Sequence, residues 1–203
     1  MKELSILQAA RMKGRLSPED AAASSGLALA EVGVQLAELE ASGMVTLVGS
    51  TYRLTPEGRL RLEGLISDEQ GSVDATELRG CYEDFDTFNT DLKAIITSWQ
   101  IKGDGTANDH TDASYDAMII ERILKLDRAF TVLLSRMILV SPRLTPYVTR
   151  FGRAVNAMEE GDHSYVARPI LDSYHTVWFE LHEELIGLLG LTRAEEAIAG
   201  RAG

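Results

Sequence analysis

The sequence is short of several residue types that particular protein classes need. Its single cysteine, Cys81, excludes a disulfide within the chain, and one cysteine with four histidines cannot build a cysteine-rich zinc module. The longest apolar stretch, residues 129–140, is interrupted by polar side chains and is shorter than the ~20 residues that a membrane span needs. The N-terminal apolar run contains Gln8 and Arg11, unlike the core of a secretory signal. We therefore expect a cytoplasmic protein with no membrane partner.

Positive charge is also scarce. The chain has 20 Lys and Arg residues against 31 Asp and Glu residues, a formal net charge of −11. This balance argues against a strongly basic nucleic-acid coat protein or a binder of anionic membranes, because both depend on an excess of cations. Any contact with nucleic acid must come from a local patch. Apolar residues, by contrast, make up 45% of the 203 positions, enough for one large domain or two small ones.

The chain is expected to divide where its apolar periodicity stops. Residues 67–74 read S-D-E-Q-G-S-V-D and contain no repeating apolar position. We therefore predict one domain over residues 1–70 and a second over residues 74–203.

In the first domain, the spacing of apolar residues changes along the chain from helical to strand-like and back to helical. Apolar residues at helical spacing predict a first short helix that ends at Gly14, and Ser17 followed by Pro18 is typical of the start of a second. A third helix is expected to end at Ser42-Gly43. Two β-rich runs and a last helix follow, at residues 44–48, at residues 51–54 and from Pro56 onward.

Two motifs in this region resemble a known family. Residues 36–45 read L-A-E-L-E-A-S-G-M-V, similar to the L-x-x-L-E-x-x-G-L-V close of the recognition helix in MarR-like bacterial regulators. Residues 54–59, L-T-P-E-G-R, resemble the L-T-x-x-G step that follows their wing. The resemblance covers about a third of the chain. It implies a mainly α fold that begins with a winged helix-turn-helix and its small β-hairpin wing, and a DNA-binding transcription regulator that works as a homodimer.

The third helix departs from that family in its charge. Residues 27–42 contain no Lys or Arg, so Gln35 is the natural base reader there. We expect contact with double-stranded DNA mainly through backbone phosphates, with Gln35, Arg53, Arg59 and Arg61 as the binding residues. Further cations precede the second helix at Arg11, Lys13 and Arg15. The alternatives are that these cations form a solvated rim and that the domain is a protein-docking module.

The second domain is expected to be an antiparallel helical bundle. Apolar stripes predict helices from Leu78 to Trp99, from Tyr115 to Met137, from Pro146 to Glu160, and from about Ser164 to Leu189 with an interruption at Pro169. We expect this domain to dimerise or to sense a small ligand. Arg136, Arg150, Arg153 and Arg168 could surround an acidic ligand, although no spacing requires it.

The last predicted helix carries the candidate metal ligands Asp172, His175 and His182. A carboxylate and a histidine three residues apart on a helix can share a divalent metal, whereas His182 lies two turns from His175 and would need help from another helix. Candidate helpers are Asp109, His110, Asp112 and Asp116. The alternative is that the two histidines are structural and hydrogen-bonded within the core.

A second resemblance covers about 130 residues of the C-terminal domain. Residues 172–185 read D-S-Y-H-T-V-W-F-E-L-H-E-E-L and residues 109–116 read D-H-T-D-A-S-Y-D, with Trp99-Gln100 before them. These segments are similar to a helical region found with actinobacterial phosphoenolpyruvate-utilising, dikinase-like proteins. The catalytic parts of a dikinase are absent from the sequence. The resemblance therefore implies an accessory or regulatory protein partner of such an enzyme, and we do not expect an enzyme.

Three hypotheses follow from these patterns. The first is a winged-helix regulator whose helical domain dimerises or senses an effector. The second is an accessory protein-interaction module that does not bind DNA. The third is a metal-dependent site in the helical domain, built on Asp172, His175 and His182.

Overall fold

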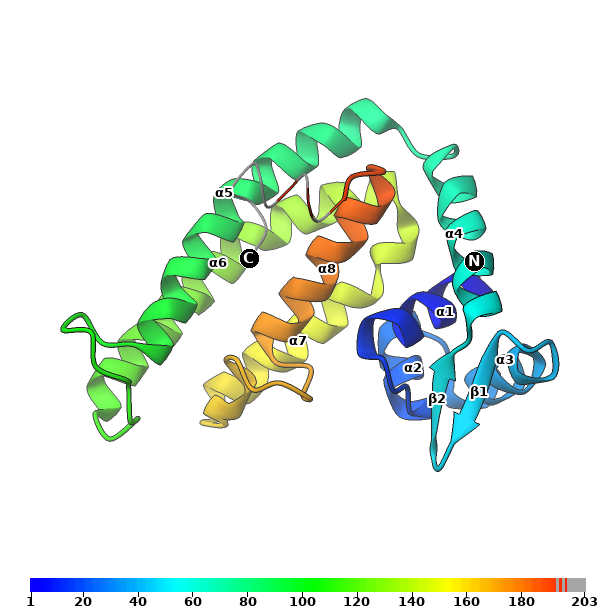
Figure 1. Ribbon diagram of the computed structural model, residues 1–203. Coiled ribbons are helices and arrows are strands. Elements are labelled where there is room, and N and C mark those ends of the chain that lie inside the picture. Colours follow the sequence, from blue (N-terminus) through cyan, green and yellow to red (C-terminus); the bar gives the residue numbers. More distant parts are fainter. Residues whose placement is uncertain (193, 195, 197–203) are drawn as a thin grey trace. The chain divides into compact units, whose positions relative to one another are not determined.

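The computed structural model describes residues 1–192, 194 and 196 (Figure 1). It is mainly helical, and within the described residues it contains one two-stranded antiparallel sheet. The expected mainly helical chain with a small hairpin is therefore confirmed. No helix among the described residues combines the length and the apolar character needed to cross a membrane.

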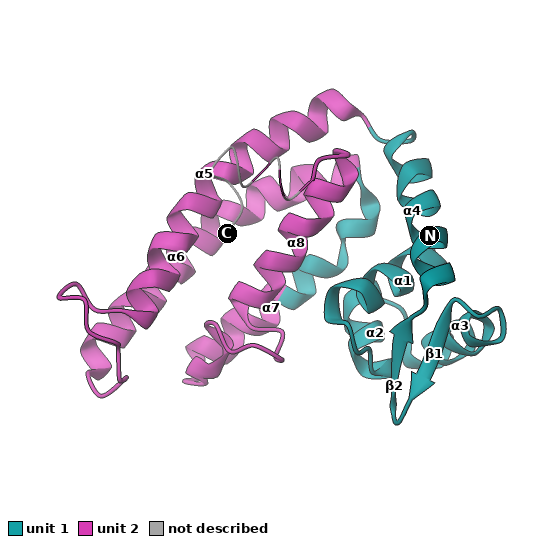
Figure 2. Ribbon diagram, viewed as in Figure 1, with its two compact units in different colours: residues 1–73, 141–150 teal, residues 74–140, 151–203 magenta. Residues whose placement is uncertain are grey.

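The chain separates into two compact units, coloured teal and magenta in Figure 2. Unit 1 comprises residues 1–73 and 141–150, and unit 2 comprises residues 74–140 and 151–203. The sequence analysis places the division between residues 70 and 74, and the first boundary between the units falls at residues 73 and 74. The return of residues 141–150 to unit 1 is a long-range feature that local patterns do not contain.

Unit 1 is built from short elements with strong local start and stop signals. Ser17 accepts a hydrogen bond from the backbone N–H of Asp20 (3.0 Å), and Thr55 accepts one from the N–H of Gly58 (2.9 Å). A proline follows each of these caps at the first helical position. The elements are α1 (Lys2–Lys13), α2 (Pro18–Ser25), α3 (Leu29–Ala41), β1 (Val45–Val48), β2 (Thr51–Leu54) and α4 (Pro56–Gln70).

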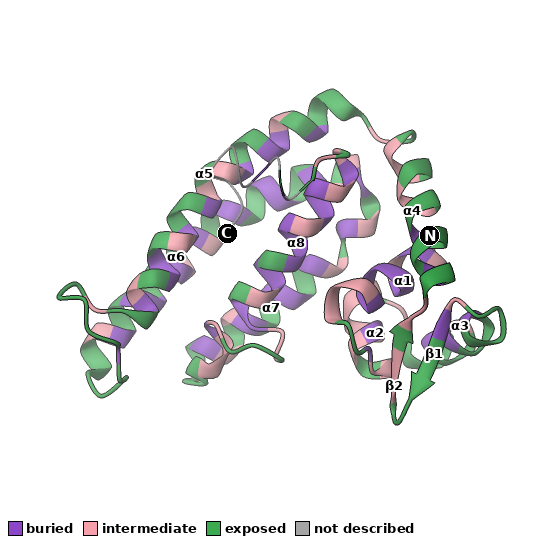
Figure 3. Ribbon diagram, viewed as in Figure 1, coloured by how far each residue is buried: buried purple, intermediate pink, exposed green. Residues whose placement is uncertain are grey.

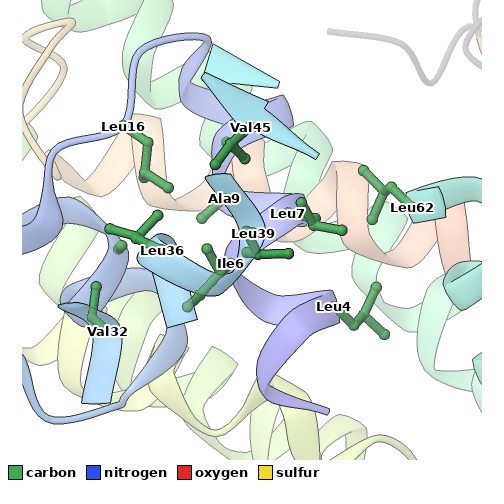
Figure 4. Packing of buried hydrophobic residues seen from close by; sticks show 12 residues of the cluster. Leu4, Ile6, Leu7, Ala9, Leu16, Val32, Leu36, Leu39, Val45 and Leu62 are labelled. Atoms are coloured by element: carbon green, nitrogen blue, oxygen red, sulfur yellow. The ribbon is translucent and has the colours of Figure 1, made fainter. Parts of the chain in front are cut away.

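The core of unit 1 is aliphatic (Figure 4). It joins Ile6 and Leu7 of α1, Leu36 of α3, Val45 of β1 and Leu62 of α4, each at most 2% exposed. Burying side chains of this kind contributes about 1.5–3 kcal/mol each to folding, so the core fixes the hairpin against the helices.

Gly58 allows the hairpin and α4 to approach closely. A Cβ atom at Gly58 would collide with the backbone carbonyl oxygen of Met44. Thr55, three residues earlier, donates its hydroxyl hydrogen to the carbonyl oxygens of Gly43 (2.7 Å) and Met44 (3.0 Å). Only glycine therefore fits this first turn of α4.

Unit 2 is built around long helices and an aromatic core. Phe85, Phe130 and Trp178 pack together, with ring centroids 4.9 Å apart for Phe85 and Trp178 and 4.4 Å apart for Phe130 and Trp178. Buried and exposed residues are interspersed along α5 and α6, whereas most residues of α8 are buried (Figure 3). The helices of unit 2 are α5 (Ala75–Gln100), α6 (Ala113–Val140) and α8 (Tyr174–Leu188), with a short 3₁₀ turn at η2 (His163–Tyr165). Helix α7 (Pro146–Glu159) belongs to unit 2 from Phe151 onward, whereas its first five residues and the 3₁₀ turn η1 (Pro142–Leu144) belong to unit 1.

The last predicted helix is shorter than expected. Helix α8 begins at Tyr174, and residues 163–173 form the η2 turn and irregular backbone. Asp162 accepts a hydrogen bond from the N–H of Ser164 (3.1 Å), and Ser173 accepts one from the N–H of Thr176 (3.3 Å). These two caps, with Pro169 between them, divide the segment because proline cannot continue a helix. Asp172 therefore precedes the helix that carries the two histidines.

Candidate functional site

The arginines predicted to bind DNA differ in their surroundings. Arg53 lies on β2, Arg59 and Arg61 lie on α4, and all three are exposed. Arg61 is engaged within unit 1, because its Nε and Nη2 atoms donate to the two carboxylate oxygens of Glu3 at 2.9 and 2.7 Å. This bidentate pair lowers the pKa of Glu3 and raises the pKa of Arg61, chiefly through the hydrogen bonds. Arg59 and Arg61 also point to different sides of α4, because side chains two positions apart on a helix are separated by about 200° around its axis.

The predicted base reader, Gln35, is half-buried and is also engaged. Its side-chain amide donates to a carboxylate oxygen of Glu38 at 2.6 Å on the same helix. The rest of the exposed α3 surface combines acids with apolar side chains: Leu29 is 51% exposed and Val34 is 59% exposed. The structure therefore gives α3 a surface poor in groups that contact phosphate.

The sheet register places a further arginine beside Arg53. Leu16 forms an isolated antiparallel bridge with Tyr52, and the two residues exchange backbone N–H to O=C bonds of 2.9 and 2.8 Å. The bridge is limited to this one pair, and it brings the residue before Leu16, Arg15, into the neighbourhood of the residue after Tyr52, Arg53.

Both arginines are exposed, and Arg53 lies on the solvent face of the hairpin. Leu16 and Val45 are buried on the other face, and side chains alternate between the faces. No described residue forms a salt bridge or a side-chain hydrogen bond with Arg15, Arg53 or Arg59. We call Arg15 and Arg53 the hairpin arginine pair. The sequence analysis named Arg15 as a nearby cation, but only the pairing of Leu16 with Tyr52 brings it to Arg53.

The three candidate metal ligands lie in three different environments. Asp172 is half-buried in the turn before α8, His175 is exposed in the first turn of that helix, and His182 is buried. Although His175 is exposed as a residue, desolvation of its ring by the surrounding chain lowers its pKa. Among residues 1–192, 194 and 196, no group of three or more His, Cys, Asp or Glu side chains is placed to hold a metal ion.

His182 belongs to a buried hydrogen-bond network. Tyr82 donates its single hydroxyl hydrogen to Glu196 Oε2 (2.5 Å), so the 3.0 Å contact between Tyr82 Oη and His182 Nε2 requires the histidine to be the donor. The ring of His182 also packs against Phe85 at 5.2 Å between centroids. This is the arrangement of a structural histidine.

The most developed candidate site is a cavity of about 410 Å³ in unit 2. Its wall comes from the end of α5, the loop that follows, the start of α6 and the turn around η2. The lining includes Trp99, Gln100, His110, Asp116, His163 and Arg168. The sequence analysis named five of these residues, all but His163, in separate contexts. Their convergence depends on how α5, α6 and the η2 turn pack, which no local motif encodes.

A carboxylate and a histidine are joined at this cavity. Asp116 is 3% exposed, and its oxygens lie 3.0 and 3.2 Å from Nδ1 of His110. Asn108 donates to Asp116 Oδ1 at 2.8 Å and to the carbonyl oxygen of Trp99 at 3.1 Å. The backbone N–H of His110 donates to Asn108 Oδ1 (3.2 Å), and the residue adopts a positive φ of 57°. Asn108, which has no role in the sequence-based predictions, thus connects Trp99, His110 and Asp116 by hydrogen bonds.

Aromatic rings complete the site. The His110 ring lies 4.3 Å from the Trp99 ring between centroids, and His163 meets Trp99 edge-on at 6.1 Å. The loop that carries His110 is tied down by Asp109, which accepts hydrogen bonds from Lys102 (3.1 Å) and Thr111 (2.9 Å). These bonds lower the pKa of Asp109 to about 2. The loop is therefore fixed on both sides of the histidine.

Comparisons with protein-family models, with curated protein sequences and with solved structures found no match to this chain. Its function must therefore be argued from its own residues.

Proposed function

We propose that the protein is a DNA-contacting regulator in which unit 1 is a winged helix-turn-helix domain and unit 2 is an antiparallel helical bundle that dimerises or binds an effector. The order of elements in unit 1, with three helices, a two-stranded hairpin and a fourth helix, agrees with the order expected for a winged helix-turn-helix. The capped hairpin takes the place of the wing, and α3 takes the place of the recognition helix.

The observation that carries the proposal is the hairpin arginine pair. In a chain of net charge −11, Arg15 and Arg53 are exposed next to the two bridged residues Leu16 and Tyr52, without a carboxylate partner among the described residues. Two adjacent unneutralised guanidinium groups are suited to neighbouring phosphates of a DNA strand. Arg59 adds a third exposed cation on α4. By contrast, Arg61 is already neutralised by Glu3 and contributes less.

The charge of α3 determines the kind of DNA binding. Glu31 and Glu38 are exposed on α3, and Gln35 is bonded to Glu38. Carboxylates near phosphates oppose binding, so the interaction draws on the DNA backbone and discriminates little between sequences.

Dimerisation is supported by an apolar stripe on α6. Met118, Val132 and Leu139 are 52, 68 and 84% exposed. Their numbers differ by multiples of seven, so they lie along one side of the helix, where the exposed Lys125 occupies the heptad position between Met118 and Val132. If a second copy of the chain covers this stripe, the dimer carries two copies of unit 1, as the paired half-sites of a DNA operator require.

The test is a mobility-shift titration of the full chain on random-sequence duplex DNA over a salt series that starts at ~50 mM, where phosphate contacts are strong. The proposal expects retarded DNA at low salt, progressive loss of binding as salt rises, and similar affinity for unrelated sequences. Absence of any shift at the lowest salt contradicts it.

A second candidate function is favoured by the surface of α3. Leu29 and Val34 expose apolar surface beside Glu31, a combination suited to a protein partner rather than to a DNA groove. In this alternative, unit 1 is a docking module for a protein partner such as a phosphoenolpyruvate-utilising enzyme. It expects no DNA shift at any salt concentration. It also expects Val34→Glu to abolish binding to that partner, whereas the DNA proposal expects only modest weakening by added negative charge.

A further inference from the structure

The cavity of unit 2 holds a histidine whose tautomer is fixed by its neighbours. The two amide hydrogens of Asn108 go to Trp99 O and to Asp116 Oδ1. None remains for His110 Nδ1, which lies 3.2 Å from the Asn108 nitrogen. Asp116 offers only acceptor oxygens when ionised. With an ionised Asp116, His110 Nδ1 carries a hydrogen and donates it to the carboxylate.

This assignment defines what His110 offers to the cavity. In a neutral imidazole with a hydrogen on Nδ1, the other nitrogen is a hydrogen-bond acceptor. No described residue bonds to His110 Nε2, and 43% of the side chain is exposed. Because the buried carboxylate holds Nδ1, His110 presents its Nε2 atom as an acceptor at the cavity wall. The backbone of His110 adopts a positive φ, which is uncommon for residues other than glycine.

The cavity also contains a cation that forms no salt bridge with a described residue. Arg168 lines the wall and is exposed, and no described carboxylate lies within salt-bridge distance of its guanidinium group. The charge of Arg168 acts on Asp162, whose pKa is lowered mainly by hydrogen bonds from Ser164 and further by Arg168. Asp116, the carboxylate at the cavity wall, accepts hydrogen bonds from Asn108 and His110. Arg168 is therefore available to an anion from solution.

We infer that this cavity is a binding site for a small organic anion, a carboxylate or a phosphate monoester that also carries a hydroxyl group. The anionic group pairs with Arg168, and the hydroxyl group donates to His110 Nε2. The cavity volume of about 410 Å³ falls in the range of small-molecule sites. Gln100 and His163 provide further polar groups at the wall, and Trp99 provides an apolar surface.

This inference deepens the effector-sensing part of the proposed function, but its test does not use DNA. Failure of DNA binding therefore leaves the ligand result intact, and failure of ligand binding leaves the hairpin arginine pair untouched.

The experiment titrates five matched three-carbon compounds into the ¹⁵N-labelled full chain. Glycerate and glycerol 3-phosphate carry an anion and hydroxyl groups, propionate and propyl phosphate lack the hydroxyl groups, and glycerol lacks the anion. The two tryptophan indole signals report the result. Trp99 lines the cavity, whereas Trp178 is buried in the core and bonded to Asn89, so it serves as the internal control.

We expect glycerate or glycerol 3-phosphate to shift the Trp99 signal saturably, with a dissociation constant of ~1 mM, and to leave the Trp178 signal in place. Which of the two binds distinguishes a carboxylate site from a phosphate site. Propionate, propyl phosphate and glycerol should each bind at least about tenfold more weakly, because each leaves one polar group of the cavity without its partner. Saturation by neither hydroxylated anion at about 50 mM overturns the inference. So does equal binding of the hydroxyl-free anions.

Two substitutions locate the site. Arg168→Gln should weaken binding by about tenfold or more, and it changes an exposed side chain, so folding is retained. Arg153→Gln, at an exposed arginine outside the cavity wall, is the matched control. His110→Phe should remove the preference for hydroxylated anions while leaving weak anion binding. Wild-type affinity in Arg168→Gln, or an unchanged hydroxyl preference in His110→Phe, contradicts the assignment.

Discussion

The two units differ in the surroundings of the arginines that form no salt bridge with a described residue. In unit 1, Arg15 and Arg53 are exposed beside the bridge between Leu16 and Tyr52, where a long, charged polymer can reach them. In unit 2, Arg168 lies at a cavity with a fixed histidine and an aromatic ring. The first setting favours binding that depends on charge and salt, and the second favours binding that depends on shape and hydrogen-bond pattern. The two proposals thus assign two kinds of anion recognition to one acidic chain.

The largest effect is expected in the aromatic core that supports the cavity. Phe85 is fully buried and stacks on Trp178, so Phe85→Ala should lower the free energy of unfolding of unit 2 by about 3–5 kcal/mol. Urea denaturation followed by tryptophan fluorescence measures this, since both tryptophans lie in unit 2. Phe88→Ala, at a half-buried position on the same helix, should cost less. Equal losses would mean that the core is not centred on Phe85.

In unit 1 the corresponding weak point is the hairpin's contact with α4. Gly58→Ala should destabilise this unit by about 1–3 kcal/mol, because the added methyl group collides with the Met44 carbonyl oxygen. Hydrogen exchange of the β1 and β2 amides measures the change. Gly64→Ala is the matched control on the same helix, where the added atom has open space and alanine favours the helix. Faster exchange in both variants, or in neither, would contradict the role given to Gly58.

Assembly is expected to depend on unit 2 through the apolar stripe of α6. Val132→Glu should convert the dimer to a monomer of 22.2 kDa, because a buried, unpaired carboxylate opposes association. Size-exclusion chromatography with light scattering gives the mass. Thr131→Glu adds the same charge away from the stripe and should leave the dimer intact. A wild-type chain that is already monomeric would remove dimerisation from the account.

The smallest effect concerns the loop that carries His110. The pKa of Asp109 is lowered to about 2, so its contribution to stability is fully present above its ordinary pKa near 4 and is lost as the pH falls toward 2. Asp109→Asn should therefore make stability less sensitive to acid in that window. Urea midpoints at pH 5 and at about pH 3 measure this. A wild-type chain and a variant with the same pH dependence would show that the pair with Lys102 adds nothing.

Local signals predicted the elements of the fold well. Ser17 with Pro18 and Thr55 with Pro56 mark helix starts by hydrogen bonds within a few residues, and the sequence displays such signals directly. The same reasoning overextended the last helix, because the strong apolar periodicity after Ser173 was continued back across Pro169. The spacing of Asp172 and His175 therefore lost the helical geometry on which the metal prediction rested.

Long-range contacts account for what the sequence could not supply. The hairpin arginine pair depends on the bridge between Leu16 and Tyr52, and the cavity depends on Asn108 joining Trp99 to Asp116. Neither contact has a local pattern. Of the charged residues named from the sequence, only Arg15, Arg53, His110, Asp116 and Arg168 lie at these two sites. Partners decide the roles of the others as well: Arg61 is paired with Glu3, for example.

The most direct test of the account is the salt dependence of DNA binding by the Arg15→Ala/Arg53→Ala double variant, compared with wild type and with Arg153→Ala. Each lost phosphate contact should reduce the slope of log affinity against log salt by about 0.9, so the double variant should be shallower by about 1.8 on every duplex, while Arg153→Ala keeps the wild-type slope. A double variant with the wild-type slope and affinity would contradict the claim that the hairpin arginine pair contacts the DNA backbone.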